Sequence, residues 1–297
     1  MTSSPSPPRP VLTADQRISR QGLGRRQTAR LATWLVPLAL MSSACTSVPL
    51  TENGGLSSYS QLGETTGKLT KSRSFADKPA LEAARTVRIM PTSFSYAAAS
   101  RIKKPEDRAL VAHALDRALC VALSDRYQIV PPDAPADLTV RNVVSDIVPT
   151  DKVMAGASTV TSLGTSLVLP VSVPRLPFGL GGLAVEGEVQ DPTGQQRAAF
   201  LWAKGANSIT SSPRLSEVGD AYALATSYGD SFAKLIIKGK TPSLMDISLP
   251  SQQRIQAFFG GKPKYAACEN FGRAPGVPGL VAGMVGAPPE WTDKAGK

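Results

Sequence analysis

The sequence predicts an α+β fold: a single domain in which amphipathic helices pack on a mostly antiparallel sheet of about five strands. Three observations lead to this class. Residues 183–190 and 196–203 flank Asp191-Pro-Thr-Gly194, an arrangement typical of a β-hairpin. Apolar residues in 216–238 recur at helical spacing. Residues 105–125 open with a proline and two acids, as helices often do.

The other elements follow from the same patterns. Three strands and one short helix are predicted at 86–90, 127–130, 138–148 and 251–259. The alternation of the third of these strands breaks near Asn142, which predicts a bulge there.

The chain opens with a segment similar to an export signal. Residues 1–30 hold six arginines and one acid, and an apolar run of 11 residues, Leu31–Met41, follows. A positive leader before a short apolar run is typical of a secretory signal. A membrane-spanning helix needs about 20 apolar residues, so this run is too short to stay as a transmembrane anchor. We therefore expect residues 1–44 to be a lipoprotein signal peptide.

The residue after the expected cleavage is Cys45, and Ser42-Ser43-Ala44-Cys45 resembles a lipobox. The resemblance implies a diacylglyceryl thioether on Cys45 and a fatty acyl group such as palmitate on the new amino terminus. Two or more chains anchor a protein stably, at about 0.8 kcal/mol per buried CH₂. Ser42 departs from the leucine usual at its position, and a plain secretory signal remains the alternative. Thr46, rather than aspartate, follows the cysteine, which by analogy points to the outer membrane and a body facing the periplasm.

Composition divides the rest of the chain into three parts. Residues 45–80 are polar and contain several glycines, which predicts a flexible tether. Residues 81–270 contain the periodic segments and form the predicted α+β domain. Residues 271–297 are rich in glycine and proline and predict a tail without regular structure.

The domain carries a nearly uncharged insertion at 153–182. Between Lys152 and Glu186, Arg175 is the sole charged residue. One interpretation is a surface that binds a partner, oligomerises or enters a membrane. The other is a buried small-residue segment with a packed loop, which the prolines and hydroxyl groups favour because they suit lipid poorly.

Charge argues against one class of partner. Loss of residues 1–44 removes six arginines and one aspartate, so the net charge falls from +10 to +5. The remaining basic residues are scattered and do not alternate with aromatic residues, so we expect no nucleic-acid partner. A weak attraction to anionic headgroups or cell-wall polymers stays open, beside a plain solvated surface.

Two further cysteines, Cys120 and Cys268, can pair in an oxidising compartment. On the helix at 105–125, Cys120 shares a polar stripe with His113 and Arg117, so a later segment that carries Cys268 could cover it. The chain-entropy model gives up to about 5 kcal/mol for so long a closed loop. We predict this disulfide, and two unrelated thiols are the alternative.

Candidate catalytic residues are few. His113 is the sole histidine, and at about 1.5 Å per residue it lies roughly 10 Å from Cys120, too far for a thiolate–imidazole pair. Zinc sites need clustered cysteine and histidine, which the sequence does not supply. Glu186 and Glu188 share a strand face about 7 Å apart. That separation suits glycoside cleavage, but the wet face of a half-buried strand is the simpler interpretation. We predict no metal, no cofactor and no enzymatic activity.

Several stretches together resemble a proteobacterial lipoprotein family of unknown function, DUF3313. They are Gly55-Leu-Ser-Ser-Tyr-Ser-Gln-Leu62, Val87-Arg-Ile-Met-Pro91, Tyr127-Gln-Ile-Val-Pro131, Leu138-Thr-Val-Arg141, Asp146-Ile-Val-Pro-Thr150 and Val185-Glu-Gly-Glu-Val-Gln-Asp191. The resemblance spans about residues 50–240. It implies a periplasm-facing α/β lipoprotein with no known activity and no assigned catalytic residues.

The expected function is therefore that of a non-enzymatic, lipid-anchored envelope protein that binds a protein, lipid or cell-wall partner. An oligomeric outer-membrane pore or export accessory is the first alternative. A cell-wall hydrolase that uses Glu186 and Glu188 is the second. The sequence leaves the oligomeric state open.

Overall fold

The structure is a computed structural model, and it describes residues 48–153, 155–157, 179–207, 211–212, 214–240 and 250–293. All of them belong to one compact unit, residues 44–297. The predicted signal peptide 1–44 and the predicted lipidation site Cys45 lie outside the described residues, as does most of the predicted insertion 153–182.

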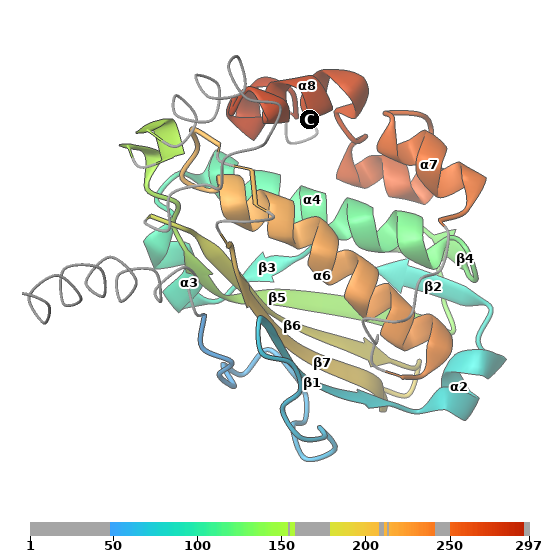
Figure 1. The fold of residues 1–297 in the computed structure, drawn as a ribbon. Coiled ribbons are helices and arrows are strands. Elements are labelled where there is room, and N and C mark those ends of the chain that lie inside the picture. The colour runs from blue at the N-terminus through green and yellow to red at the C-terminus, as the bar shows by residue number, and fades with distance from the viewer. Residues whose placement is uncertain are drawn as a thin grey trace, which may run out of the picture. The chain divides into compact units, whose positions relative to one another are not determined.

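The described residues form one mixed sheet of seven strands, in the order β1-β7-β6-β5-β2-β4, with β3 beside β5 (Figure 1). The strands are β1 (Thr70–Ala76), β2 (Thr86–Ile89), β3 (Ser93–Phe94), β4 (Gln128–Val130), β5 (Leu138–Val148), β6 (Gly182–Gln190) and β7 (Gln196–Gly205). The pairs β1–β7, β7–β6 and β6–β5 are antiparallel, whereas β5–β2, β5–β3 and β2–β4 are parallel.

The single sheet with packed helices agrees with the prediction from the sequence. The prediction of a mostly antiparallel sheet of about five strands was wrong, because the sheet has seven strands and is mixed. The parallel pairs follow from the order of the elements. A long helix lies between β2 and β4 in the chain, and a helical crossover joins strands that run in the same direction.

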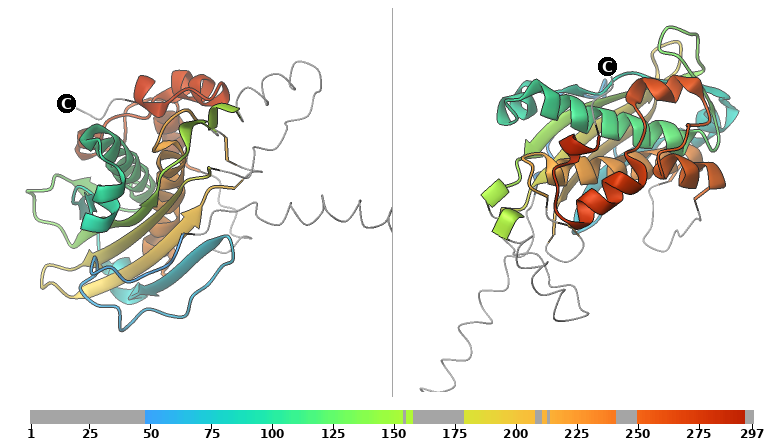
Figure 2. Two further views of the ribbon diagram at one scale, coloured as in Figure 1. Left: turned by 90° about the vertical axis from the view of Figure 1, so that its left-hand side faces the viewer. Right: turned by 90° about the horizontal axis from the view of Figure 1, so that it is seen from above.

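The helices are α2 (Lys78–Ala83), α3 (Tyr96–Arg101), α4 (Pro105–Leu123), α6 (Gly219–Lys238), α7 (Gln252–Phe258) and α8 (Gly276–Met284), with 3₁₀ turns η3 (Ala266–Phe271) and η4 (Pro289–Trp291). α4, α6 and α7 occupy the three ranges predicted to be helical. α4 and α6 lie side by side on one face of the sheet (Figures 1 and 2).

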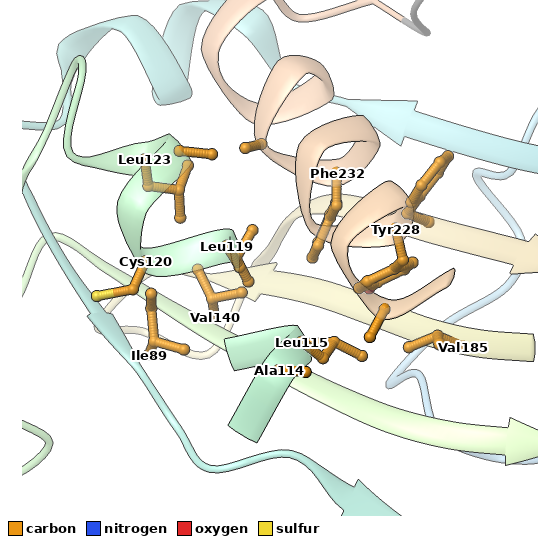
Figure 3. Packing of buried hydrophobic residues seen from close by; sticks show 14 of the residues in the cluster. Ile89, Ala114, Leu115, Leu119, Cys120, Leu123, Val140, Val185, Tyr228 and Phe232 are labelled. Carbon is orange, nitrogen blue, oxygen red and sulfur yellow. The ribbon is translucent and has the colours of Figure 1, made fainter. Parts of the chain in front are cut away.

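The main core lies between these two helices and the sheet. Figure 3 shows side chains of α4 and α6 meeting those of the strands. The contacts include Leu115, Leu119, Tyr228, Phe232, Val140 and Val185. Burial of such side chains stabilises the fold by roughly 1.5–3 kcal/mol each.

Gly187 in β6 sets how closely α6 approaches the sheet. A Cβ atom there would lie 2.1 Å from the Tyr228 hydroxyl and 2.6 Å from a ring carbon of Phe232. The same two rings stack on Phe200 of β7, at centroid distances of 5.9 and 5.6 Å. Such aromatic pairs add stability beyond the buried area, so a side chain at position 187 would displace a well-packed layer.

The predicted hairpin is the β6–β7 pair, and its turn uses Gly194 at a φ of +82°. β5 is one long strand, as predicted, but its bulge was misplaced. The register shifts between Val144 and Asp146 rather than near Asn142. Asn142 stays in the ladder opposite Gly187, and its side-chain oxygen accepts a hydrogen bond of 2.8 Å from the Tyr228 hydroxyl.

Two segments predicted to lack order belong to the domain. Within the predicted tether 45–80, Val48 is already buried and β1 forms the edge strand beside β7. Within the predicted tail 271–297, α8 packs through glycines. A Cβ at Gly276 would lie 2.5 Å from the carbonyl oxygen of Phe259, which follows α7. Small residues here permit close helix packing, whereas composition alone suggested the absence of a helix.

Candidate functional site

Residues 48–62, here called the N-terminal strap, lie on the sheet face opposite α4 and α6 (Figure 1). Leu56 and Leu62 pack against Ala199 and Leu201 of β7. Those two residues alternate with Phe200, which faces the helices, so they point to the other side of the sheet. The strap therefore gives the sheet a second, smaller core.

Glu186 fixes the middle of the strap. One carboxylate oxygen accepts a hydrogen bond from the backbone N–H of Asn53 at 2.6 Å. The other accepts bonds from the Gly55 N–H and the Tyr59 hydroxyl, both at 2.6 Å. A Cβ at Gly55 would lie 2.5 Å from that second oxygen. Only glycine therefore fits so close to the carboxylate. Burial, with the Glu186 hydrogen bond second, raises the pKa of Tyr59 to about 12.

Glu188 fixes the next turn of the strap. Its Oε2 accepts hydrogen bonds from the Ser57 N–H at 2.9 Å, the Ser57 hydroxyl at 2.7 Å and the Gln196 amide at 3.2 Å. The other oxygen accepts a bond from Gln190 at 3.0 Å. Each carboxylate is thus held by several donors, as a buried charge requires.

The prediction that Glu186 and Glu188 form the wet face of a half-buried strand was wrong. They are 1% and 3% exposed because the strap covers them. A polysaccharide cannot reach either carboxylate in this arrangement, so the geometry does not supply the open pair that glycoside cleavage needs.

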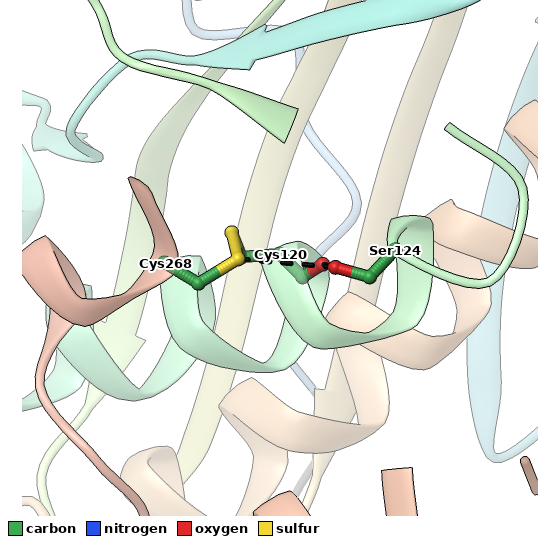
Figure 4. Close-up of a disulfide and its surroundings, with 3 residues drawn as sticks. All are labelled: Cys120, Ser124 and Cys268. Atoms are coloured by element: carbon green, nitrogen blue, oxygen red, sulfur yellow. Dashed lines mark hydrogen bonds between the residues drawn. A yellow bond between two sulfur atoms is a disulfide. The ribbon is translucent and has the colours of Figure 1, made fainter. Parts of the chain in front are cut away.

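A second cluster joins the end of the chain to α4. The structure links Cys120 and Cys268 in a disulfide, with Cα atoms 5.8 Å apart and both residues buried (Figure 4). Ser124, one turn after Cys120, donates from its hydroxyl to the Cys120 carbonyl at 2.7 Å. The Lys264 ammonium donates to the Ser124 carbonyl at 3.1 Å. The polar stripe on α4 is thus covered by a later segment, η3.

Arg117 lies on the same stripe and binds residues near the end of the chain. Its guanidinium donates to Asp293 at 2.5 Å and to the Phe271 carbonyl at 3.4 Å. The Tyr222 hydroxyl also donates to Asp293 at 2.5 Å. Burial, followed by the charge of Asp293, raises the pKa of Tyr222 well above its usual value. These contacts join α4, α6 and residues 271–293.

A cavity of about 580 Å³ lies beneath residues 250–293, here called the C-terminal layer. Figures 1 and 2 show α7 and α8 of this layer beside α4 and α6. Its apolar lining includes Ala118, Val121, Ala223, Phe258, Phe259 and Leu280. Ligand pockets commonly have volumes of about 300–1,000 Å³ and apolar walls with a few polar groups.

Four arginines border this cavity. Arg117 pairs with Asp293, Arg254 with Asp230, and Arg273 with Glu269. Arg214 lies over the Tyr222 ring, 5.6 Å from its centroid. Within the part of the chain that the structure describes, Arg214 makes no ion pair with a carboxylate. The cavity can therefore offer a cation to an anionic group.

Other residues singled out in the sequence do not come together. His113 is partly exposed on α4, and burial and the Arg117 charge lower its pKa. Among the described residues, no three histidine, cysteine or acidic side chains are grouped to hold a metal ion. None of the helices in those same residues has both the length and the apolar character needed to cross a bilayer.

Neither the strap nor the cavity was predicted from the sequence. A signal for the strap was present, because the stretch Gly55–Leu62 carries Ser57 and Tyr59 at polar positions between two leucines. The cavity had no such signal, because its walls come from α4, α6 and the C-terminal layer.

Comparisons with known proteins place the chain in a family. No curated protein matches the chain. Among solved structures, two crystals of PelC dodecamers from Paraburkholderia phytofirmans, a single-residue variant in space group C2 and PelC in space group P6, are similar at 10% sequence identity. Their TM-scores are 0.34 and 0.35, and each match covers 56% of this chain and 96% of the PelC chain. A likeness this low carries no argument about assembly or activity.

The model of a family described as "Protein of unknown function (DUF3313)" matches residues 51–232. This match covers more than half of the sequence, so the chain belongs to the DUF3313 family.

Proposed function

We propose that this chain is a lipid-anchored protein of the bacterial cell envelope that binds an amphiphilic molecule and catalyses no reaction. The anchor is Cys45, in the outer membrane, and the body faces the periplasm. The ligand has an apolar body and an anionic group. The observation that carries the binding role is the cavity of about 580 Å³ beneath the C-terminal layer.

The lining of the cavity supports this ligand chemistry. Its apolar walls favour an apolar body, because burial of apolar surface is worth about 25 cal/mol per Å². Arg214 borders the same space and stacks on Tyr222. A guanidinium presents several donors in a fixed plane, which suits a carboxylate, sulfonate or phosphate group.

Binding is tested with the fluorescent amphiphile 1-anilinonaphthalene-8-sulfonate. Ala223 is an exposed residue on the α6 wall, and a tryptophan there would fill the cavity. We expect Ala223→Trp to weaken probe binding by about tenfold or more, equivalent to at least about 1.4 kcal/mol.

Ala97 on α3 provides a matched control, since it is also an exposed helical alanine and does not line the cavity. Ala97→Trp should bind the probe like the unmodified protein. Equal binding by Ala223→Trp and the unmodified protein would contradict the cavity as the site.

The anchor is tested separately by cell fractionation. Cys45→Ser removes the sulfur that would carry the diacylglyceryl group. We expect the unmodified protein in the membrane fraction and this variant in soluble or uncleaved form. An unmodified protein that is recovered without acyl groups on Cys45 would contradict the anchor.

A further inference from the structure

We infer that the end of the sheet beside Val48 lies directly on the bilayer, with a group of exposed apolar side chains in the headgroup region. This inference rests on the proposed lipid anchor at Cys45. It goes beyond that proposal because it names the face of the domain that meets the membrane.

Only a short length of chain joins Cys45 to the buried Val48. Val48 is 2% exposed and packs against Ala184 and Ala203. Gly182 makes room for it, because a Cβ there would lie 2.2 Å from a methyl group of Val48. Three residues of chain span at most about 11 Å. An acylated Cys45 therefore cannot lie far from the strand end at Gly182.

Several strands end beside Gly182. Gly182 pairs with Val148 and with Gly205, so β5, β6 and β7 all have an end there. Thr70, the first residue of β1, pairs with Lys204 one position away.

Three hydrogen bonds bring further segments to the same end. The Thr150 N–H donates to the Glu217 carbonyl at 2.8 Å, and the Leu215 N–H donates to the Gly286 carbonyl at 2.9 Å. The Ser216 hydroxyl also bonds to the Glu290 carboxylate. The end of α8 and η4 are therefore attached beside the strand ends.

Exposed large apolar side chains gather at this end of the sheet. Six of them lie on or next to the segments just described: Leu69, Val153, Leu215, Met284, Val285 and Trp291. Met284 is 78% exposed and Trp291 is 72% exposed. At the opposite end of the sheet, the turn 191–195 and the loop 131–137, both within the described residues, contribute no exposed large apolar side chain. The exposed Ile255, Phe258 and Phe259 of α7 lie in the helical layer, where Ser251 bonds to Asp125 beyond the end of α4.

The strand ends and the turns beside them therefore differ between the two ends of the sheet in exposed apolar area, the property that a membrane selects. Tryptophan and apolar side chains are favoured at the boundary between headgroups and acyl chains, where binding grows with the apolar area that is buried. The polar turn of the β6–β7 hairpin would project away from the bilayer.

Tryptophan fluorescence provides the test. Removal of residues 1–44 also removes Trp34, which leaves Trp202, 1% exposed, and Trp291. The mature lipidated protein is incorporated into phosphatidylethanolamine and phosphatidylglycerol vesicles, with and without phosphatidylcholine brominated near the headgroup. We expect the brominated lipid to quench most of the Trp291 emission. Trp291→Phe should lose this quenching, because Trp202 is buried.

A matched reporter at the opposite end is Gln195→Trp in the Trp291→Phe background, since Gln195 is an exposed turn residue. Its emission should be insensitive to brominated lipid. Vesicle-bound protein with unquenched Trp291, or with Gln195→Trp quenched as strongly, would overturn the membrane-facing end while leaving the anchor intact. Protein that does not co-sediment with vesicles would overturn the anchor, and this inference with it.

Discussion

Glu186 and Glu188 are buried, and the hydrogen bonds described for them come from polar N–H and O–H groups rather than from cations. Hydrogen bonds to a charged acceptor are stronger than neutral ones, and their loss in the interior leaves donors without partners. The two side chains therefore act as structural acceptors that hold the strap on the sheet.

Replacing Glu186 by glutamine should destabilise the protein. The change turns one acceptor oxygen into a donor that faces other donors, and we expect a loss of about 1–3 kcal/mol in the free energy of unfolding. Urea denaturation followed by circular dichroism measures it. Glu82→Gln is the control, because Glu82 is exposed and its carboxylate pairs with Lys78 on the same helix; its effect should stay within about 0.5 kcal/mol. Equal effects would contradict the acceptor role.

Asp116 predicts a pH dependence. Burial raises its pKa to about 7, although Thr92 donates to it from N–H at 2.9 Å and from its hydroxyl at 2.5 Å. In the unfolded chain the pKa is about 3.9. Between these values the folded state retains a proton that the unfolded state has lost. Stability from this group therefore falls as pH rises from about 4 to about 7, by up to about 1.4 kcal/mol per unit.

The contribution of Asp116 is obtained by comparison with Asp116→Asn, which keeps an oxygen acceptor for Thr92 but does not titrate. Unfolding is measured by urea at several pH values from 4 to 7. The difference in unfolding free energy between the two proteins should change steadily over this range. A constant difference would show that Asp116 has the same pKa in both states.

The sequence predicted some residue roles and missed others for one physical reason. A polar stripe on a helix must be covered by another segment or solvated. The position of Cys120 on such a stripe was therefore enough to predict its pairing with Cys268. Alternation in a strand separates two faces but does not say what covers each one. The cover over Glu186 comes from residues more than 125 positions earlier, so its burial could not be predicted locally.

At the scale of elements, the long helices and the central hairpin followed from periodicity, while the edges of the sheet did not. β1 reads Thr-Lys-Ser-Arg-Ser-Phe-Ala, and most of its side chains are half-buried. An edge strand of this kind carries charges that discourage pairing with another chain. It therefore lacks the apolar alternation by which an inner strand is recognised. The direction of the short strands β2 and β4 depends on the crossover between them and is not encoded in either strand.

The disulfide joins the C-terminal layer to α4. Loss of this disulfide should therefore destabilise that layer more than the sheet. The bond closes a loop of 148 residues, for which the chain-entropy model gives up to about 5 kcal/mol. In Cys120→Ser/Cys268→Ser we expect faster hydrogen exchange in η3 and α8, and weaker binding of the fluorescent amphiphile. The β6–β7 hairpin is the internal control and should change little. Equal exchange of η3 in both proteins would contradict this role of the disulfide.

At the scale of the whole molecule, the docked strap limits how far the body could lie from the proposed anchor at Cys45. A tether of 36 residues would let the domain move far from a bilayer, whereas a chain already buried at Val48 does not. The strap occupies the sheet face opposite the helices, and the cavity lies beyond those helices. The proposed anchor and the proposed ligand site thus involve different residues, so each can be disrupted without the other.

Hydrogen–deuterium exchange of the strap amides in the mature protein tests this account most directly. The N–H groups of Asn53, Gly55 and Ser57 donate to Glu186 and Glu188. We predict that they exchange slowly, and that Glu186→Gln accelerates the exchange of Asn53 and Gly55. Exchange of all three at the rate of an unstructured peptide would contradict a docked strap and restore the flexible tether.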